Sequence, residues 1–114
     1  MVKIELVSPD VAEKLCRDVA EDLPEYFGLL EVNEHYAVGV RSRINLAAKL
    51  ESKYIGLISV DFPYSNNSDI YWLALFKECH SRNIGSDLIK AACVLAARDN
   101  YECNMVYMVK TISF

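Results

Sequence analysis

The sequence predicts an α/β domain in which a mixed sheet of about five strands is flanked by helices. The chain has 114 residues, which suits one domain, and its apolar fraction of 53% is enough for a hydrophobic core. Strand and helix patterns alternate in the order βααβββαβ, and one pair of strands is joined by a turn short enough for an antiparallel hairpin. We therefore expect a single domain over residues 1–114, with helices on both faces of the sheet.

The first half of the chain predicts a strand over 2–7 and then two helices. Ser8 is a suitable N-cap, Pro9 suits the first helical position, and Asp10 is favourable to the helix dipole. The helix that follows has an apolar residue at every fourth position, formed by Val11, Leu15, Val19 and Leu23. A second run of helical spacing predicts a helix over 29–40.

The second half predicts a hairpin, a strand, a helix and a last strand. The hairpin strands cover 44–50 and 54–62, with a tight polar turn between them. Residues 63–68 are rich in Pro, Ser and Asn and predict a loop. A strand over 69–76, a helix from Ile84 to about Asp99 and a strand over 105–112 complete the order.

The most informative stretch is 69–86, where an apolar strand runs through a short polar loop into a helix. A helix N-terminus presents unpaired backbone N–H groups, and these attract phosphate. The strand before the loop is apolar enough to be buried on both faces. This order predicts a site for a nucleotide-like cofactor.

Composition limits the binding partners and the cellular compartment that we expect for the protein. The net charge of −4 argues against a nucleic-acid partner, and no apolar run approaches the roughly 20 residues of a membrane span. We read no signal peptide and expect a cytoplasmic protein. Its cysteines show no CxxC spacing and are expected to be reduced thiols; they are Cys16, Cys79, Cys93 and Cys103. The two histidines have no partner at ligand spacing, so no metal site is expected.

The order of elements and the residues at 80–86 resemble the GNAT superfamily of acyl-CoA-dependent N-acyltransferases. The family motif is Gln/Arg-x-x-Gly-x-Gly/Ala at the start of the helix after the fourth strand, and His80, Asn83 and Gly85 stand at the corresponding positions. Asn83 replaces a glycine that usually has a positive φ, which asparagine tolerates better than other residues. Gly85 would let a pyrophosphate approach the backbone. Residues 55–59 are similar to the family's third strand, and the resemblance spans nearly the whole chain.

The resemblance implies that the protein uses acetyl-CoA to acetylate an amine, either a small molecule or a peptide, that the sequence does not identify. It implies that the backbone N–H of Leu73 faces the thioester carbonyl and that Leu75 pairs with the pantetheine arm. Arg82 or Lys77 would add charge pairing. The cofactor residues implied in this way are Leu73, Ala74, Leu75, His80, Ser81, Arg82, Asn83, Ile84, Gly85 and Ser86.

Several side chains have two interpretations. Asp69 stands where relatives often place a glutamate as general base, or it is a polar residue at a strand edge. Tyr71 and Tyr107 are an acid or an acceptor-site wall, or else packing residues of strands. His80 is a catalytic base, or a packing or capping residue. Cys79 is a thiol with a lowered pKa beside a helix N-terminus, or an inert thiol.

The family continues beyond its fifth strand, whereas this chain ends at Phe114. By resemblance we expect a domain cut short after that strand. The function is then either acetyl transfer, or binding of CoA or a partner chain by an inactive domain. An uncovered apolar strand over 105–112 predicts a homodimer interface within 105–114. Glu31, Glu34 and residues 41–43 border the acceptor in relatives, or form a solvated helix face.

Overall fold

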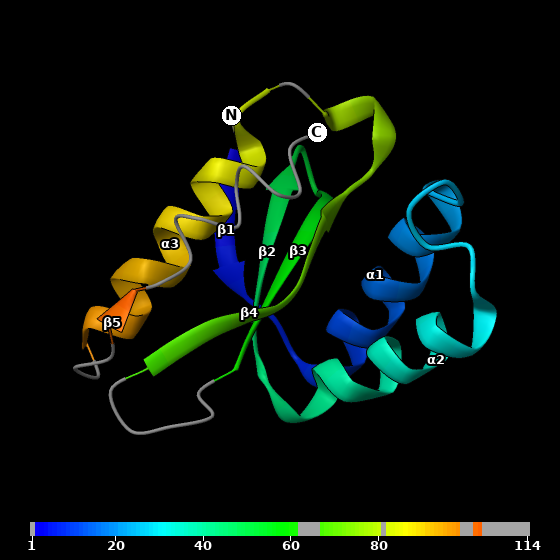
Figure 1. The fold of residues 1–114 in the computed structure, drawn as a ribbon. Helices are drawn as coiled ribbons and strands as arrows, with labels where there is room; N and C mark the ends of the chain where they lie inside the picture. Colours follow the sequence, from blue (N-terminus) through cyan, green and yellow to red (C-terminus); the bar gives the residue numbers. More distant parts are fainter. Residues whose placement is uncertain (1, 62–66, 81, 99–101, 104–114) are drawn as a thin grey trace.

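The structure, a computed structural model, describes residues 2–61, 67–80, 82–98 and 102–103. Strands and helices follow the predicted order (Figure 1). The helices are α1 (Pro9–Asp22), α2 (Leu30–Gly39) and α3 (Ile84–Arg98), with short 3₁₀ turns η1 (Val40–Ser42) and η2 (Lys77–Cys79). The strands are β1 (Val2–Leu6), β2 (Ile44–Leu50), β3 (Lys53–Asp61), β4 (Asn67–Leu75) and the two-residue β5 (Glu102–Cys103).

Within the described residues, the sheet has four full strands, β1 to β4, and each neighbouring pair of these is antiparallel. β5 adds only a short parallel bridge beside Asn67 and Ser68. The prediction of about five strands is therefore correct for four of them. The expected strand over 105–112, and with it the expected dimer interface, lies outside the described residues. The predicted loop over 63–68 ends earlier than expected, because Asn67 and Ser68 already belong to β4.

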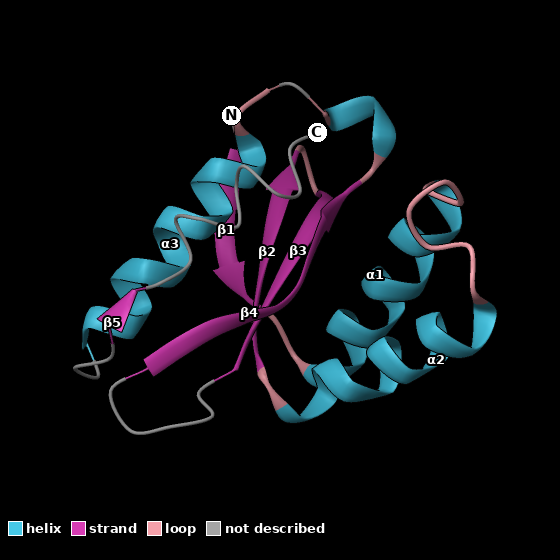
Figure 2. Ribbon diagram, viewed as in Figure 1, coloured by secondary structure: helices cyan, strands magenta, loops and turns pink. Residues whose placement is uncertain are grey.

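Helices cover both faces of the sheet, as predicted. Figure 2 shows α3 on one side and the α1–α2 pair on the other. Because side chains alternate along a strand, neighbouring residues of β4 belong to different cores. Leu73 and Leu75 pack with α3, whereas Trp72 and Ala74 pack with α1 and α2. The central strands are therefore buried on both faces.

The start of α1 confirms the sequence prediction. The Oγ of Ser8 accepts a hydrogen bond from the backbone N–H of Val11 at 3.3 Å, and Pro9 begins the helix. The predicted stripe faces the sheet, with Leu15 and Val19 buried. The hairpin is also confirmed: Glu51 and Ser52 connect β2 to β3 with φ of 49° and 74°. Positive φ at both turn residues matches the right-handed twist of the strands.

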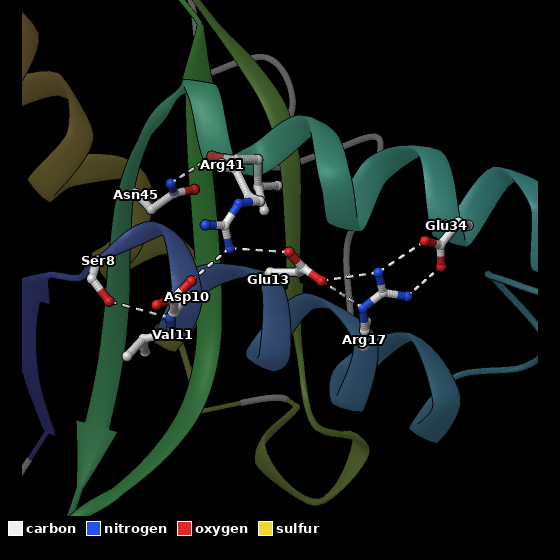
Figure 3. A network of polar contacts seen from close by, with 9 residues as sticks. Ser8, Asp10, Val11, Glu13, Arg17, Glu34, Arg41 and Asn45 are labelled. Atoms are coloured by element: carbon white, nitrogen blue, oxygen red, sulfur yellow. Dashed lines mark hydrogen bonds and ion pairs between the residues drawn. The ribbon is translucent and has the colours of Figure 1, made fainter.

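The second helix is held by the apolar packing of Ala37 and Tyr36 and also by charge. Only Ala37 is buried among the residues of α2, while Leu30 is 82% exposed. A chain of ion pairs joins α2 and η1 to α1, with Glu13 between Arg17 and Arg41 (Figure 3). Glu13 lies 3.0 Å from Arg17 and 3.1 Å from Arg41, and Arg17 also pairs with Glu34 of α2. The position of α2 should therefore depend on salt and pH.

We expect Glu34→Gln to weaken this attachment in a pH-dependent way. Hydrogen bonds from Arg17 lower the pKa of Glu34 below its ordinary value. Because this pKa is lower in the folded protein, the ion pair stabilises the fold at pH values above the ordinary pKa of a glutamate. That stabilisation is lost as the pH falls through the folded-state pKa. The variant should show a lower urea midpoint at pH 7 in dilute salt. The difference should diminish as the pH falls through the folded-state pKa of Glu34, and it should be smaller in about 1 M salt.

A matched control is Glu31→Gln, which removes the same charge from α2 where no ion pair forms within the described residues. It should change the midpoint less and with little salt dependence. Equal midpoints for the Glu34→Gln and Glu31→Gln variants at pH 7 in dilute salt would contradict the attachment argument.

Cysteine chemistry corrects one expectation. Cys16 and Cys79 are free thiols, as predicted, but Cys93 is disulfide-bonded. Pairing depends on which thiols the fold brings together, and spacing in the sequence does not reveal it. Cysteine usage thus no longer supports the cytoplasmic expectation. Across the described parts of the chain, no helix is both long and apolar enough to cross a bilayer.

Candidate cofactor site at the end of β4

The outer edge of β4 presents backbone groups that no described strand pairs. The N–H of Phe76 donates to the carbonyl of Ile55 in β3 at 3.0 Å. Because successive residues of a strand point their N–H groups to opposite sides, Ala74 also faces β3, and Leu73 and Leu75 face away from it. On that side β5 pairs only with Asn67 and Ser68.

This geometry separates the residues that the resemblance assigns to the cofactor on β4. Leu73 and Leu75 direct their N–H and C=O groups to the open edge, while their side chains are buried against α3. Ala74 has its polar groups turned toward β3 and its methyl group buried toward α1 and α2. Of these three residues, Leu73 and Leu75 are therefore the ones whose backbone faces an extended ligand along this edge, where the Leu75 carbonyl also contacts the His80 ring.

The loop after β4 is fastened at both of its ends. The backbone N–H of Lys77 donates to Oδ2 of Asp22 at 2.6 Å, which ties the loop to the end of α1. The His80 ring lies with Nε2 2.9 Å from the carbonyl oxygen of Leu75. This contact agrees with the interpretation of His80 as a capping residue. The Lys77 ammonium lies 3.7 Å from Glu25, so its charge is already paired.

The start of α3 has the conformation that the sequence predicts. Asn83 has a φ of 59°, which confirms that asparagine replaces glycine at a positive φ. Its carbonyl accepts from the N–H of Asp87 at 3.1 Å, so the helix begins directly after it. The first N–H groups of α3, including those of Gly85 and Ser86, have no partner within an α-helix and can donate to an anion. The predicted residue Ser81 lies outside the described residues.

A cavity of about 400 Å³ adjoins this loop. It lies between the β2–β3 turn and η2, with Cys79 and Ile55 among its lining residues. Arg82 also lines it and, among the described residues, makes no ion pair. Of the two cations that the resemblance suggests, Arg82 is therefore the one whose charge remains available. The complete lining is Leu50, Glu51, Lys53, Ile55, Glu78, Cys79 and Arg82.

Burial settles the interpretation of the thiols. Cys79 is 4% exposed, and burial raises its pKa despite the nearby helix start. The pKa of Cys16 is raised by burial to about 12. A thiol with a raised pKa is mostly protonated at neutral pH and reacts slowly as a nucleophile. The inert interpretation of Cys79 is therefore supported.

Asp69 lies away from the Leu73 backbone. It is exposed near the start of β4, directly opposite Asp61 of β3. Four residues of extended strand separate it from Leu73, which corresponds to about 13 Å. Direct proton transfer needs hydrogen-bond distance. The structure therefore does not bring these two predicted catalytic residues together.

Tyr71 is a packing residue in the structure, and Arg43 is its unexpected neighbour. The Arg43 guanidinium carbon lies 3.6 Å from the centre of the Tyr71 ring. The edge of Tyr36 meets the same ring with centroids 5.3 Å apart. Sequence reasoning assigned residues 41–43 to an acceptor border or a solvated face. It missed this contact because the signal, an arginine just before a strand, does not reveal a stacking partner far along the chain.

Comparison with solved structures identifies the fold. A putative acetyltransferase from Pyrococcus horikoshii is 13% identical with a TM-score of 0.73, and the match covers 90% of this chain and 78% of that chain. A ribosomal-protein-alanine N-acetyltransferase from Brucella melitensis is 14% identical with a TM-score of 0.67, covering 100% and 92%. An aminoglycoside 6′-N-acetyltransferase complexed with coenzyme A is 15% identical with a TM-score of 0.71, covering 87% and 57%.

These likenesses show that the chain has the fold of GNAT N-acetyltransferases over most of its length, as the resemblance implied. Identities of 13–15% establish the fold and nothing finer. The chain spans little more than half of the aminoglycoside enzyme, at 57% of its length. No protein-family model and no curated protein sequence matches the chain.

Proposed function

We propose that this protein binds acetyl-CoA along the open edge of β4 and transfers the acetyl group to an amine. The observation that carries the proposal is the continuity between that edge and the start of α3. Backbone groups of Leu73 and Leu75 face outward, and a few residues later Asn83 holds a positive φ at the helix start. A ligand with an extended arm joined to a pyrophosphate would place the arm along the strand edge and the pyrophosphate at the start of the helix.

The residues fit the cofactor by the chemistry of their donors. Leu75 and Leu73 would pair with the amide-containing arm as an added strand would, and the first turn of α3 would hold the pyrophosphate. Arg82 supplies the available cation beside that turn. When bound, acetyl-CoA supplies a thioester carbonyl for attack by the amine. The Leu73 N–H is the donor proposed to stabilise the developing oxyanion.

Proton removal from the amine is assigned to Asp69 only through water. The carboxylate is exposed and therefore solvated, and the strand places it about 13 Å from Leu73. Acetylation of an ammonium requires loss of a proton before attack, and at this distance Asp69 would accept that proton only through intervening water. The acceptor remains an amine of unspecified structure.

A second candidate is a domain that binds CoA without catalysis. This candidate is favoured by the distance between Asp69 and Leu73, together with the packed position of Tyr71. Asp69 lies about 13 Å along the strand from Leu73, and the Tyr71 ring is packed against Arg43. The two candidates share the cofactor site and differ only in turnover.

Two measurements test the proposal. Calorimetry should detect binding of CoA and acetyl-CoA by the full chain. Release of free CoA thiol from acetyl-CoA should then depend on an amine, in a panel of polyamines, aminoglycosides and peptides with a free N-terminus. Binding without amine-dependent release selects the non-catalytic candidate. Absence of binding to either ligand rejects both candidates.

A further inference from the structure

One residue of β4 interrupts the regular pairing between β3 and β4. Ser59 of β3 lies opposite Trp72, and Val60 lies opposite Ile70, so Tyr71 is an extra residue in β4. An extra residue of this kind forms a β-bulge. Beyond a bulge, the phase of the strand shifts by one residue. The presence of the bulge between Ile70 and Trp72 therefore decides which N–H groups of the following part of β4 face the open edge.

Tyr71 is held on three sides. The Arg43 guanidinium stacks on its ring at 3.6 Å, and the edge of Tyr36 meets the ring from α2. Its hydroxyl end lies against Gly39, where a Cβ atom would approach Cζ of the ring to 2.8 Å. We call Gly39, Tyr36 and Arg43 the Tyr71 clamp.

Arg43 holds the clamp together and links it to β3. Its Nη1 donates to the carbonyl of Gly39 at 2.7 Å, and its Nη2 lies 3.4 Å from Asp61 of β3. The Nε is buried with no hydrogen-bond partner among the described residues, which costs stability. The stack and the two Nη contacts must offset that cost. Arg43 thus joins the end of α2, the end of β3 and the bulge of β4.

We propose that Arg43 is a positioning residue that acts through Tyr71 to keep the Leu73 N–H at the open edge of β4. This inference rests on the proposed function, because the Leu73 N–H is the donor assigned there to the thioester carbonyl. If the bulge were lost and Tyr71 took the place of Trp72 opposite Ser59, Leu73 would lie opposite Leu57 and its N–H would turn toward β3. Arg43 itself contacts neither cofactor nor acceptor in this scheme.

The test compares Arg43→Met with Arg41→Met in the full chain. Methionine keeps much of the length of arginine but loses the planar cation. Arg41 belongs to η1, just before Arg43, yet it pairs with Asp10 and Glu13 and does not touch Tyr71. Arg43→Lys is the second variant, which keeps a charge for Asp61 without the flat stacking surface.

The first readout is the amide NMR signal of Leu73 in the protein without ligand. It should move in Arg43→Met and Arg43→Lys and stay in place in Arg41→Met. The second is the ¹³C signal of the carbonyl of labelled acetyl-CoA bound to each variant. It should shift toward the value of free acetyl-CoA in the Arg43 variants, while their Kd for CoA stays within about twofold of the unaltered protein.

Each outcome has a defined meaning. An unmoved Leu73 amide in a folded Arg43 variant overturns the inference, and so does a bound carbonyl signal that matches the unaltered protein. A change of equal size in Arg41→Met also overturns it, because the effect would then be general. If the unaltered protein binds no acetyl-CoA, the proposed function fails. The Leu73 amide then decides whether Arg43 sets the β4 edge at all.

Discussion

A Gly85→Val variant is expected to lose binding of CoA while the domain stays folded. Gly85 lies in the first turn of α3, next to Asn83 and its positive φ. The proposed pyrophosphate site uses the backbone N–H groups of this turn, and a glycine lets a ligand approach them closely. A branched side chain would cover those donors. We expect the Kd for CoA to rise at least about tenfold, which corresponds to about 1.4 kcal/mol.

Stability should not fall in parallel, because valine has a higher helix propensity than glycine. Thermal unfolding and calorimetry of the same samples separate the two effects. Lys90→Val is the matched control, since it places the same side chain on an exposed position of α3. Asn83→Gly is a second control that keeps the positive φ available. A folded Gly85→Val protein with unchanged CoA affinity would refute this placement of the pyrophosphate.

Most elements of the fold could be predicted from local features of the sequence. Ser8 and Pro9 mark the start of α1, and the four-residue apolar spacing gives its buried face. The turn at Glu51 and Ser52 is short enough that the hairpin follows from the sequence. Asn83 could be assigned a positive φ because few other residues tolerate it. Each of these features depends on neighbours within a few positions.

Features that depend on distant contacts could not be predicted. The bulge at Tyr71 requires the register of β3 against β4, and residue types alone do not fix that register. The stack of Arg43 on Tyr71 joins residues far apart in the chain. The disulfide of Cys93 likewise depends on which thiols the fold brings together. The conformation of the loop into α3 could therefore be predicted, but the contacts that support β4 behind it could not.

Gly39→Ala should destabilise the protein through the Tyr71 clamp. Alanine is ordinarily favourable over glycine within a helix, by up to about 1 kcal/mol. Here the added Cβ would meet the Tyr71 hydroxyl and lie 2.8 Å from Cζ and 3.1 Å from Cε2. Overpacking of this kind typically costs about 1–3 kcal/mol. A fall in the free energy of unfolding would thus identify the clash, because propensity alone predicts a rise.

The double variant Gly39→Ala with Tyr71→Phe isolates the contact. Phenylalanine keeps the ring for Arg43 and Tyr36 but removes the oxygen that the new Cβ would strike. We therefore expect Gly39→Ala to cost less in the Tyr71→Phe background, with a coupling of about 1–2 kcal/mol from urea unfolding of the four proteins. Tyr71→Phe alone should change stability little.

The same cycle bears on how the open edge of β4 is maintained. If Gly39→Ala displaces the Tyr71 ring, the bulge loses one side of its support, and the Leu73 amide signal should move as it does in Arg43→Met. Tyr71→Phe removes the hydroxyl but leaves the ring carbon Cζ 2.8 Å from the new Cβ, so it should return only part of that signal and of the lost stability. Equal costs of Gly39→Ala in both backgrounds, together with an unmoved Leu73 amide signal, would mean that the helix end, and not the tyrosine, absorbs the added methyl group. The clamp would then not explain the position of the bulge.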